Sequence, residues 1–293
     1  MKGNTQDLTK GSIVKAIILF SIPLLIGNLF QQLYNAVDSY VVGNHVGKVA
    51  LEAVGASTPI INMLIGFFMG ISTGAGVVIA QFFGAGNTCK MKRAIHNSIA
   101  LTLVMGVVLT IVGLLFNDPI LKAIGVPSEV FSEASTYLSI YFWSLIFVMV
   151  YNMGSGILRS VGDSKRPLYF LIFSSVVNII LDFLFVKYFH FGVAGAGYAT
   201  LIAQAISAIM VMYVLMKTED DYKVILKEIG FDKEILLKII KMALIKMNLL
   251  VNVLIIFMTL IMLLVIGLMI SLDLKVFMKM ITKKQKILIR LVI

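Results

Sequence analysis

Two carboxylates lie inside stretches that are apolar enough to cross a membrane. Asp182 belongs to residues 168–188, a segment long enough to span a bilayer as one helix, and Asn178 precedes it by four residues. In a helix these two side chains lie on one face. Because an ionised group in hydrocarbon costs about 2.5–3.5 kcal/mol on insertion scales, it usually faces a cavity or a partner. Asp182 is therefore the first candidate for function, and a carboxylate paired only for packing is the alternative.

The second carboxylate belongs to the first apolar segment, about residues 13–42. Gln31, Asn35 and Asp38 are spaced by four and three residues, which places them on one helical face. Pro23 lies in the same segment and has no N–H to donate, so it weakens the helix there. We expect Pro23 to act as a hinge; a static bend is the alternative.

The composition indicates an integral membrane protein. The chain of 293 residues is 59% hydrophobic and 14% charged, and its mean hydropathy is +0.99. The net charge of +10 comes from lysines and arginines in short runs between apolar segments. This pattern indicates membrane topology and excludes a nucleic-acid partner, which would require a basic face. Cys89 is the only cysteine of the sequence, so an intrachain disulfide is excluded.

The apolar segments predict an all-α membrane protein with six spanning helices. Lys and Arg are abundant in alternate connections, so the positive-inside rule places the N-terminus in the cytoplasm. The predicted spans cover about residues 13–42, 59–83, 95–116, 137–158, 168–188 and 193–216. The predicted domains are a cytoplasmic N-terminal segment (1–12), a six-helix transmembrane lobe (13–217), an amphipathic cytoplasmic linker (218–243) along the membrane surface, and a hydrophobic and basic tail (244–293).

Helix rise brings polar groups of three spans to one depth. Counted from the cytoplasmic ends of their spans, Asp38 and Asp182 both fall in the outer half of a core about 30 Å thick. Thr200 of the sixth span reaches a similar depth, and Gln204 follows it on the same helical face. The sequence thus predicts one polar site within the lobe.

The tail differs in composition from the rest of the chain. Residues 244–293 contain no Ala, Pro, Tyr, Trp or Glu and are rich in Leu, Ile, Met and Lys. Residues 249–270 are long enough for a seventh hydrophobic helix, but a crossing there would place the following lysines outside, against the charge rule. We interpret the tail as a low-complexity or out-of-frame end that replaces a longer natural continuation.

Four motifs resemble those of the multidrug and toxic compound extrusion (MATE) family. They are NLFQQLYNAVDSYVVG at 28–43, GILRSVGDSKRPLY at 156–169, NIILD at 178–182 and GVAGAGYAT at 192–200, and the resemblance covers about residues 8–242. In that family two six-helix lobes enclose a cleft, and cation-driven alternating access exports organic, often cationic, compounds. The resemblance implies that this chain corresponds to the N-terminal lobe.

The resemblance also implies roles for particular residues. Asp38 and Asp182 look like the coupling acids, and Asn178 looks like their amide partner. Asn152 and Thr200 resemble further polar members of the cation site, while Gln31, Asn35 and Gln204 are expected to line the substrate cleft. Carboxylate, amide and hydroxyl oxygens suit either a proton or Na⁺, so the expected coupling ion is one of these, with no other cofactor and no catalytic residue.

Other readings of the sequence remain open. With half of the cleft absent, transport requires a homodimer or a separate C-terminal lobe; otherwise the chain is a non-transporting fragment or partner subunit. A flippase for lipid-linked polysaccharide or cell-wall precursors shares the two-lobe plan, but its cleft is typically cationic. An intramembrane aspartyl protease requires a membrane-embedded G-x-G-D acid, whereas Asp163 lies in a basic loop. We therefore expect an exporter of small organic compounds in the cytoplasmic membrane.

Overall fold

The described part of the chain is a set of long helices. The computed structural model describes residues 13–246 and contains helices and loops over that range. The predicted N-terminal segment (1–12) and the predicted tail beyond residue 246 lie outside the described residues. The elements are α1 (Ile13–His45), α2 (Lys48–Gly84), α3 (Thr88–Ala123), α4 (Ser128–Ser160), α5 (Lys165–Asp182), the π-helix η1 (Phe183–Tyr188), α6 (Gly192–Lys217), the 3₁₀ turn η2 (Leu226–Glu228) and α7 (Lys233–Lys246).

Five helices of the described range are long and apolar enough to cross a membrane. They are α2, α3, α4, α5 with η1, and α6. The helix α1, with 33 residues, is the remaining helix of the six that the sequence predicts. The helices α2 and α3 have 37 and 36 residues, and each rises about 55 Å, well beyond a hydrocarbon core of about 30 Å. The predicted spans were shorter because hydropathy marks only the apolar part of each helix.

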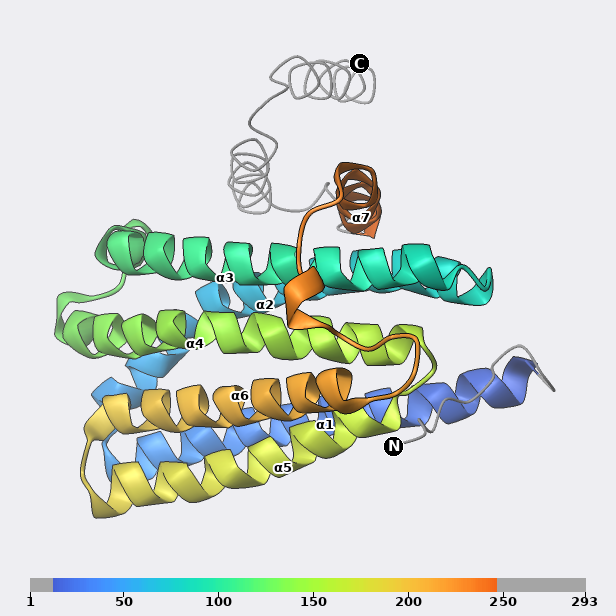
Figure 1. Ribbon diagram of the computed structural model, residues 1–293. Helices are drawn as coiled ribbons and strands as arrows, with labels where there is room; N and C mark the ends of the chain where they lie inside the picture. The colour runs from blue at the N-terminus through green and yellow to red at the C-terminus, as the bar shows by residue number, and fades with distance from the viewer. Residues whose placement is uncertain (1–12, 247–293) are drawn as a thin grey trace, which may run out of the picture. The chain divides into compact units, whose positions relative to one another are not determined.

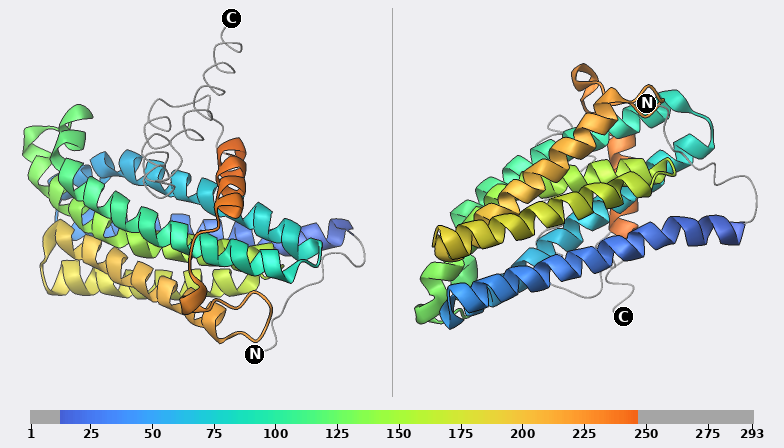
Figure 2. Two further views of the ribbon diagram at one scale, coloured as in Figure 1. Left: turned by 45° about the horizontal axis from the view of Figure 1, so that its top comes forward. Right: turned by 90° about the horizontal axis from the view of Figure 1, so that it is seen from below.

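The helix α4 lies at the centre of the packing. It packs against α2, α3 and α6, and Figure 1 shows α4 between α3 and α6. Two glycines allow these close approaches: a Cβ atom at Gly113 would overlap the ring of Phe142, and one at Gly156 would overlap the hydroxyl of Ser72. Small residues at helix contacts are the usual means of close packing within a membrane. The helix α1 packs chiefly against α5 and lies along one edge of the bundle in Figure 2.

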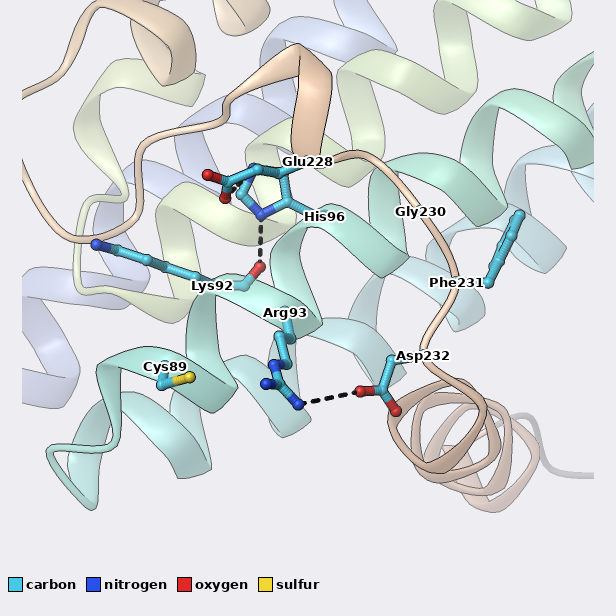
Figure 3. Close-up of a pocket in the computed structure, with 8 residues that line it drawn as sticks. All are labelled: Cys89, Lys92, Arg93, His96, Glu228, Gly230, Phe231 and Asp232. Atoms are coloured by element: carbon cyan, nitrogen blue, oxygen red, sulfur yellow. Dashed lines mark hydrogen bonds and ion pairs between the residues drawn. The ribbon is translucent and has the colours of Figure 1, made fainter.

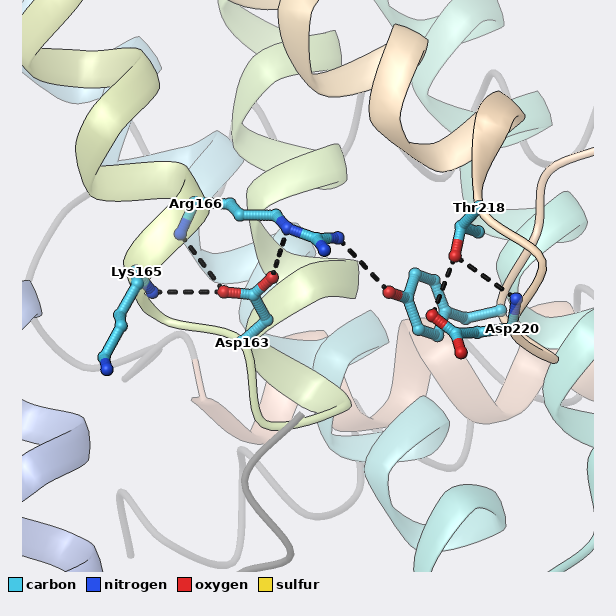
Figure 4. Close-up of polar contacts among 6 residues, drawn as sticks. Asp163, Lys165, Arg166, Thr218 and Asp220 are labelled. Atoms are coloured by element: carbon cyan, nitrogen blue, oxygen red, sulfur yellow. Dashed lines mark hydrogen bonds and ion pairs between the residues drawn. The ribbon is translucent and has the colours of Figure 1, made fainter. Parts of the chain in front are cut away.

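The loop between α4 and α5 is fixed by a buried acid. Gly162 takes the left-handed conformation (φ 90°) at the end of α4, and the buried Asp163 follows it. The Asp163 carboxylate accepts hydrogen bonds from the backbone N–H of Lys165 (3.2 Å) and Arg166 (3.1 Å), and its second oxygen pairs with Arg166 Nε at 3.2 Å (Figure 4). Arg166 also donates to the Tyr222 hydroxyl (3.4 Å), whose pKa is raised by burial. This contact joins the start of α5 to the segment after α6.

The predicted linker has two different halves. Residues 218–232, called the connector below, are mostly irregular and include only the short turn η2. The helix α7 follows and packs against α2 and α3. The apolar side of α7 is thus covered by the lobe's own helices, and the position of the linker along the membrane surface stays a prediction.

Candidate cation site

Asp38 of α1 and Asp182 of α5 are both buried within the lobe. Their side chains are 6% and 0% exposed, and their carboxylates lie within electrostatic range of each other. Tyr137 of α4 donates a hydrogen bond to Asp38 Oδ2 at 3.4 Å. One oxygen of each acid, Asp38 Oδ1 and Asp182 Oδ1, has no hydrogen-bond partner within the described range. A buried acceptor without a donor is costly, so both oxygens are suited to a proton or a cation.

Asn178 joins the acid on α5 to the helix α6. In the amide orientation that satisfies both of its ends, Asn178 Nδ2 donates to Asp182 Oδ2 at 3.1 Å, and its oxygen accepts from the backbone N–H of Thr200 at 3.3 Å. The spacing of four residues between Asn178 and Asp182 makes the first contact possible within one helix. The structure therefore brings together Asp38, Asp182, Asn178 and Thr200, which the sequence had placed at one depth.

Apolar side chains seal one end of this polar group. Val41, Val186 and Ala196 belong to a buried cluster formed by residues of α1, α2, α4, η1 and α6. Val41 and Val186 lie about one turn beyond Asp38 and Asp182 in the chain, toward the ends of α1 and η1. The acids are therefore bordered by apolar side chains at that end.

The backbone changes its hydrogen-bonding pattern at Asp182. The helix α5 ends at this residue, and the π-helix η1 begins with Phe183. A π-helical turn widens the helix by one residue, and such turns occur frequently at functional sites. Residues 183–188 contain neither Gly nor Pro, so the sequence carries no signal for this change.

Tyrosines that the sequence analysis did not select complete the group. Tyr34 lies within electrostatic range of both acids, and Tyr137 contacts Asp38. The spacing of four residues between Tyr34 and Asp38 could have identified the first. Tyr137 has no such signal, because it comes from a helix that is distant in sequence.

Other predicted site residues lie outside this group. Asn152 is fifteen residues beyond Tyr137 in the unbroken α4, which is about 22 Å along the helix. Its amide donates to Val148 O in its own helix, and its main-chain oxygen accepts from Ser72. The prediction that Asn152 lies with the two acids is corrected accordingly. Tyr137 is the residue of α4 that contacts Asp38, and Asn152 lies four turns further along the same helix.

The predicted cleft and hinge residues lie on α1 and α6. Asn35 is exposed, and Gln31 and Gln204 are half-buried. Gln31 lies two turns before Asp38, and Gln204 lies one turn after Thr200, so both are on the side of the acids away from the apolar seal. Pro23 is buried within α1, which is one continuous helix from Ile13 to His45.

Known proteins match this chain over most of its length. The MatE family profile matches residues 23–184. A probable multidrug resistance protein of Bacillus subtilis, YoeA, is 33% identical over 245 residues, covering 81% of this chain and 53% of that protein. Two solved structures, of MATE in the bent and in the straight conformation, are 31% identical with TM-scores of 0.78 and 0.77 and cover 84% of this chain and 55% of theirs. The chain thus spans about half the length of these relatives, and it belongs to the MATE family.

Proposed function

We propose that the six-helix lobe is one half of a cation-coupled exporter of small organic compounds, and that Asp38 and Asp182 bind the coupling ion. The observation that carries this proposal is the buried pair of acids bridged to α6 through Asn178. Buried acids inside a membrane bundle mark ion pathways and proton relays in transporters. The Bacillus subtilis relative, a probable multidrug resistance protein, supports the substrate class.

The donor atoms of the site fit a proton or Na⁺. Asp38 and Asp182 supply carboxylate oxygens and Thr200 supplies a hydroxyl oxygen, while the Asn178 amide donates to Asp182 and holds it in place. Hard cations prefer such oxygen ligands. Binding of either ion neutralises the repulsion between the acids, so α1 gains freedom to change its course relative to α5.

The same proposal includes a hinge in α1 at Pro23. Relatives of this chain have been solved in a conformation described as bent and in one described as straight. In α1 the weak point is Pro23, which removes one helical hydrogen bond and lies four turns before Asp38. When the coupling ion binds to Asp38 and Asp182, α1 changes from one conformation to another. This change alters the access of substrate to Gln31, Asn35 and Gln204.

A facing half completes the cleft. Transport through one lobe requires a second wall, which a second copy of the chain or a separate C-terminal lobe provides. The protein lies in the cytoplasmic membrane with its N-terminus inside, as the distribution of Lys and Arg indicates. The first wall of the cleft is the exposed polar face of α1 around Asn35.

Ethidium efflux tests the proposal. The chain is expressed in a strain that lacks its major exporters, as wild type and as Asp182→Asn. Asp118→Asn is the matched control, because Asp118 is an exposed acid of α3. We expect Asp182→Asn to abolish efflux and Asp118→Asn to preserve it.

Two further outcomes are decisive. If the inserted wild-type chain exports nothing, a C-terminal half from the Bacillus subtilis relative is co-expressed, and restored efflux that is sensitive to Asp182→Asn supports the proposal. Failure of this complementation, or efflux that is unaffected by Asp182→Asn, refutes it.

A further inference from the structure

The connector lies against the first turns of α3 and is held there by opposite charges. Lys92 Nζ lies 3.4 Å from Asp221, and Arg93 Nη1 lies 3.6 Å from Asp232. His96 Nε2 lies 3.9 Å from the carboxylate of Glu228. Figure 3 shows the Arg93 pair and the ring of His96 beneath the connector. Lys92 and Arg93 thus form charge pairs with acidic side chains near the start and at the end of the connector, and His96 lies between these pairs.

Two buried hydrogen bonds fix the same contact. The backbone N–H of Ile225 donates to His96 Nε2 at 2.9 Å, while His96 Nδ1 lies 2.7 Å from the oxygen of Lys92. This arrangement assigns the proton to Nδ1 and leaves Nε2 as the acceptor. The fully buried Asn97 donates to the backbone oxygen of Asp232 at 2.7 Å. These bonds attach the connector to α3 near its middle and at its end.

Apolar packing supports the first part of the connector, where Tyr222 and Val224 are each 2% exposed, and is sparse over residues 225–231. A pocket of about 380 Å³ lies between it and α3, lined by Cys89 and Phe231 among others. Leu226 and Phe231 of the connector are 62% and 46% exposed. The charge pairs are themselves partly exposed, so each is weak and is screened by salt. Segments with few buried contacts open at low cost, and residues 225–231 of the connector have this character.

The helix α7 is held in a different way. Leu236, Ile239 and Ile240 are buried against the lobe. Gly74 of α2 makes this approach possible, because a Cβ atom there would lie 2.5 Å from the backbone nitrogen of Ala243. A side chain at this position therefore cannot be accommodated without moving α7.

We propose that the connector and α7 form a releasable clamp on α2 and α3. Residues 225–231 of the connector are the weakly packed part of the clamp, and α7 is the closely packed part. Its opening is a step of the transport cycle, and this part of the inference rests on the proposed function. By the positive-inside rule the clamp lies on the cytoplasmic side, against α2 and α3.

Hydrogen–deuterium exchange of the purified full chain tests whether the clamp exists. Gly74→Ala should raise exchange in α7 at least tenfold, whereas Gly66→Ala should leave it at the wild-type rate, because a Cβ at Gly66 meets nothing within 4 Å. Lys92→Glu should raise exchange at the Ile225 amide several-fold, and the double variant with Asp221→Lys should restore protection. Equal exchange in the two glycine variants, or no change in Lys92→Glu, overturns the clamp.

A cross-link tests whether the clamp must open. Phe231→Cys is combined with the native Cys89, since both line the same pocket, and a short bis-maleimide joins them. We expect the cross-linked chain to lose ethidium efflux, while the same variant treated with a monofunctional maleimide retains it. Unchanged efflux after complete cross-linking refutes release as a transport step. Absence of efflux in the untreated chain, even with a co-expressed C-terminal half, would overturn both the proposed function and the proposed release during transport, while exchange would still report on the clamp itself.

Discussion

Asn178→Leu provides the sharpest test of the acid pair, because it removes one amide and keeps the side-chain size. In the variant, Asp182 Oδ2 loses the donor at 3.1 Å, and the N–H of Thr200 loses the acceptor at 3.3 Å. A hydrogen bond to a charged group contributes roughly 1.5–3 kcal/mol. The bond joins two side chains of the protein, so its loss weakens Na⁺ binding only by misplacing Asp182, and the affinity should fall, by at most about tenfold to a hundredfold.

The assay is Na⁺ binding to the purified chain by isothermal titration calorimetry, followed by ethidium efflux. Asn152→Leu is the matched control, because Asn152 is also an amide inside a membrane helix but bonds only within α4 through its side chain. We expect Asn152→Leu to bind Na⁺ with less than a threefold change. Equal losses in the two variants would show that Asn152 belongs to the site after all, and an unchanged Asn178→Leu would refute the bridging role.

Other substitutions test individual contacts. Tyr137→Phe removes the long hydrogen bond at 3.4 Å and should weaken Na⁺ binding only by about twofold to tenfold in the same titration. Gly113→Ala forces a methyl group into an aromatic ring of α4 and should lower stability by about 1–3 kcal/mol, measured as a lower aggregation temperature of a fluorescent fusion. Asp163→Ala, which removes a helix cap and leaves a guanidinium unpaired, should lower that temperature more than Asp163→Asn does. Pro23→Ala should reduce efflux but preserve Na⁺ binding, whereas Pro59→Ala, at an exposed proline of α2, should change neither.

Much of the fold follows from patterns that the sequence displays directly. Long apolar segments separated by basic runs predict an all-α membrane lobe, and the structure confirms this fold class. The common depth of Asp38, Asp182 and Thr200 follows from the rise of 1.5 Å per residue alone. The argument treats the ends of a spanning helix as fixed by the bilayer, so that a residue number translates into a depth, and this depth stays a prediction.

The depth of a residue in the membrane does not specify which helices are neighbours. The sequence analysis therefore did not identify every side chain that reaches the site from other helices. Tyr137 reaches Asp38 only because α4 lies at the centre of the packing, a fact that no local spacing reveals. The same limit explains Asn152: its polarity resembled that of the site residues, but its position along α4 separates it from them. The π-helical turn after Asp182 is set by tertiary packing in a stretch without Gly or Pro.

The unequal packing of the helices indicates which part of the lobe responds to the coupling ion. Around α4 the contacts are close and depend on glycines such as Gly113 and Gly156, so these helices resist relative movement. The helix α1 is different, because at Gly27 it meets only leucine side chains of α5 at ordinary contact distance, and Leu25 and Leu29 are 67% and 69% exposed. A change of charge between Asp38 and Asp182 acts equally on both helices, but the displacement is greater in the one with the weaker restraint. If the acids bind the coupling ion as proposed, we expect neutralisation of the pair to move α1 and to leave the scaffold around α4 in place, as a gate within a rigid lobe requires.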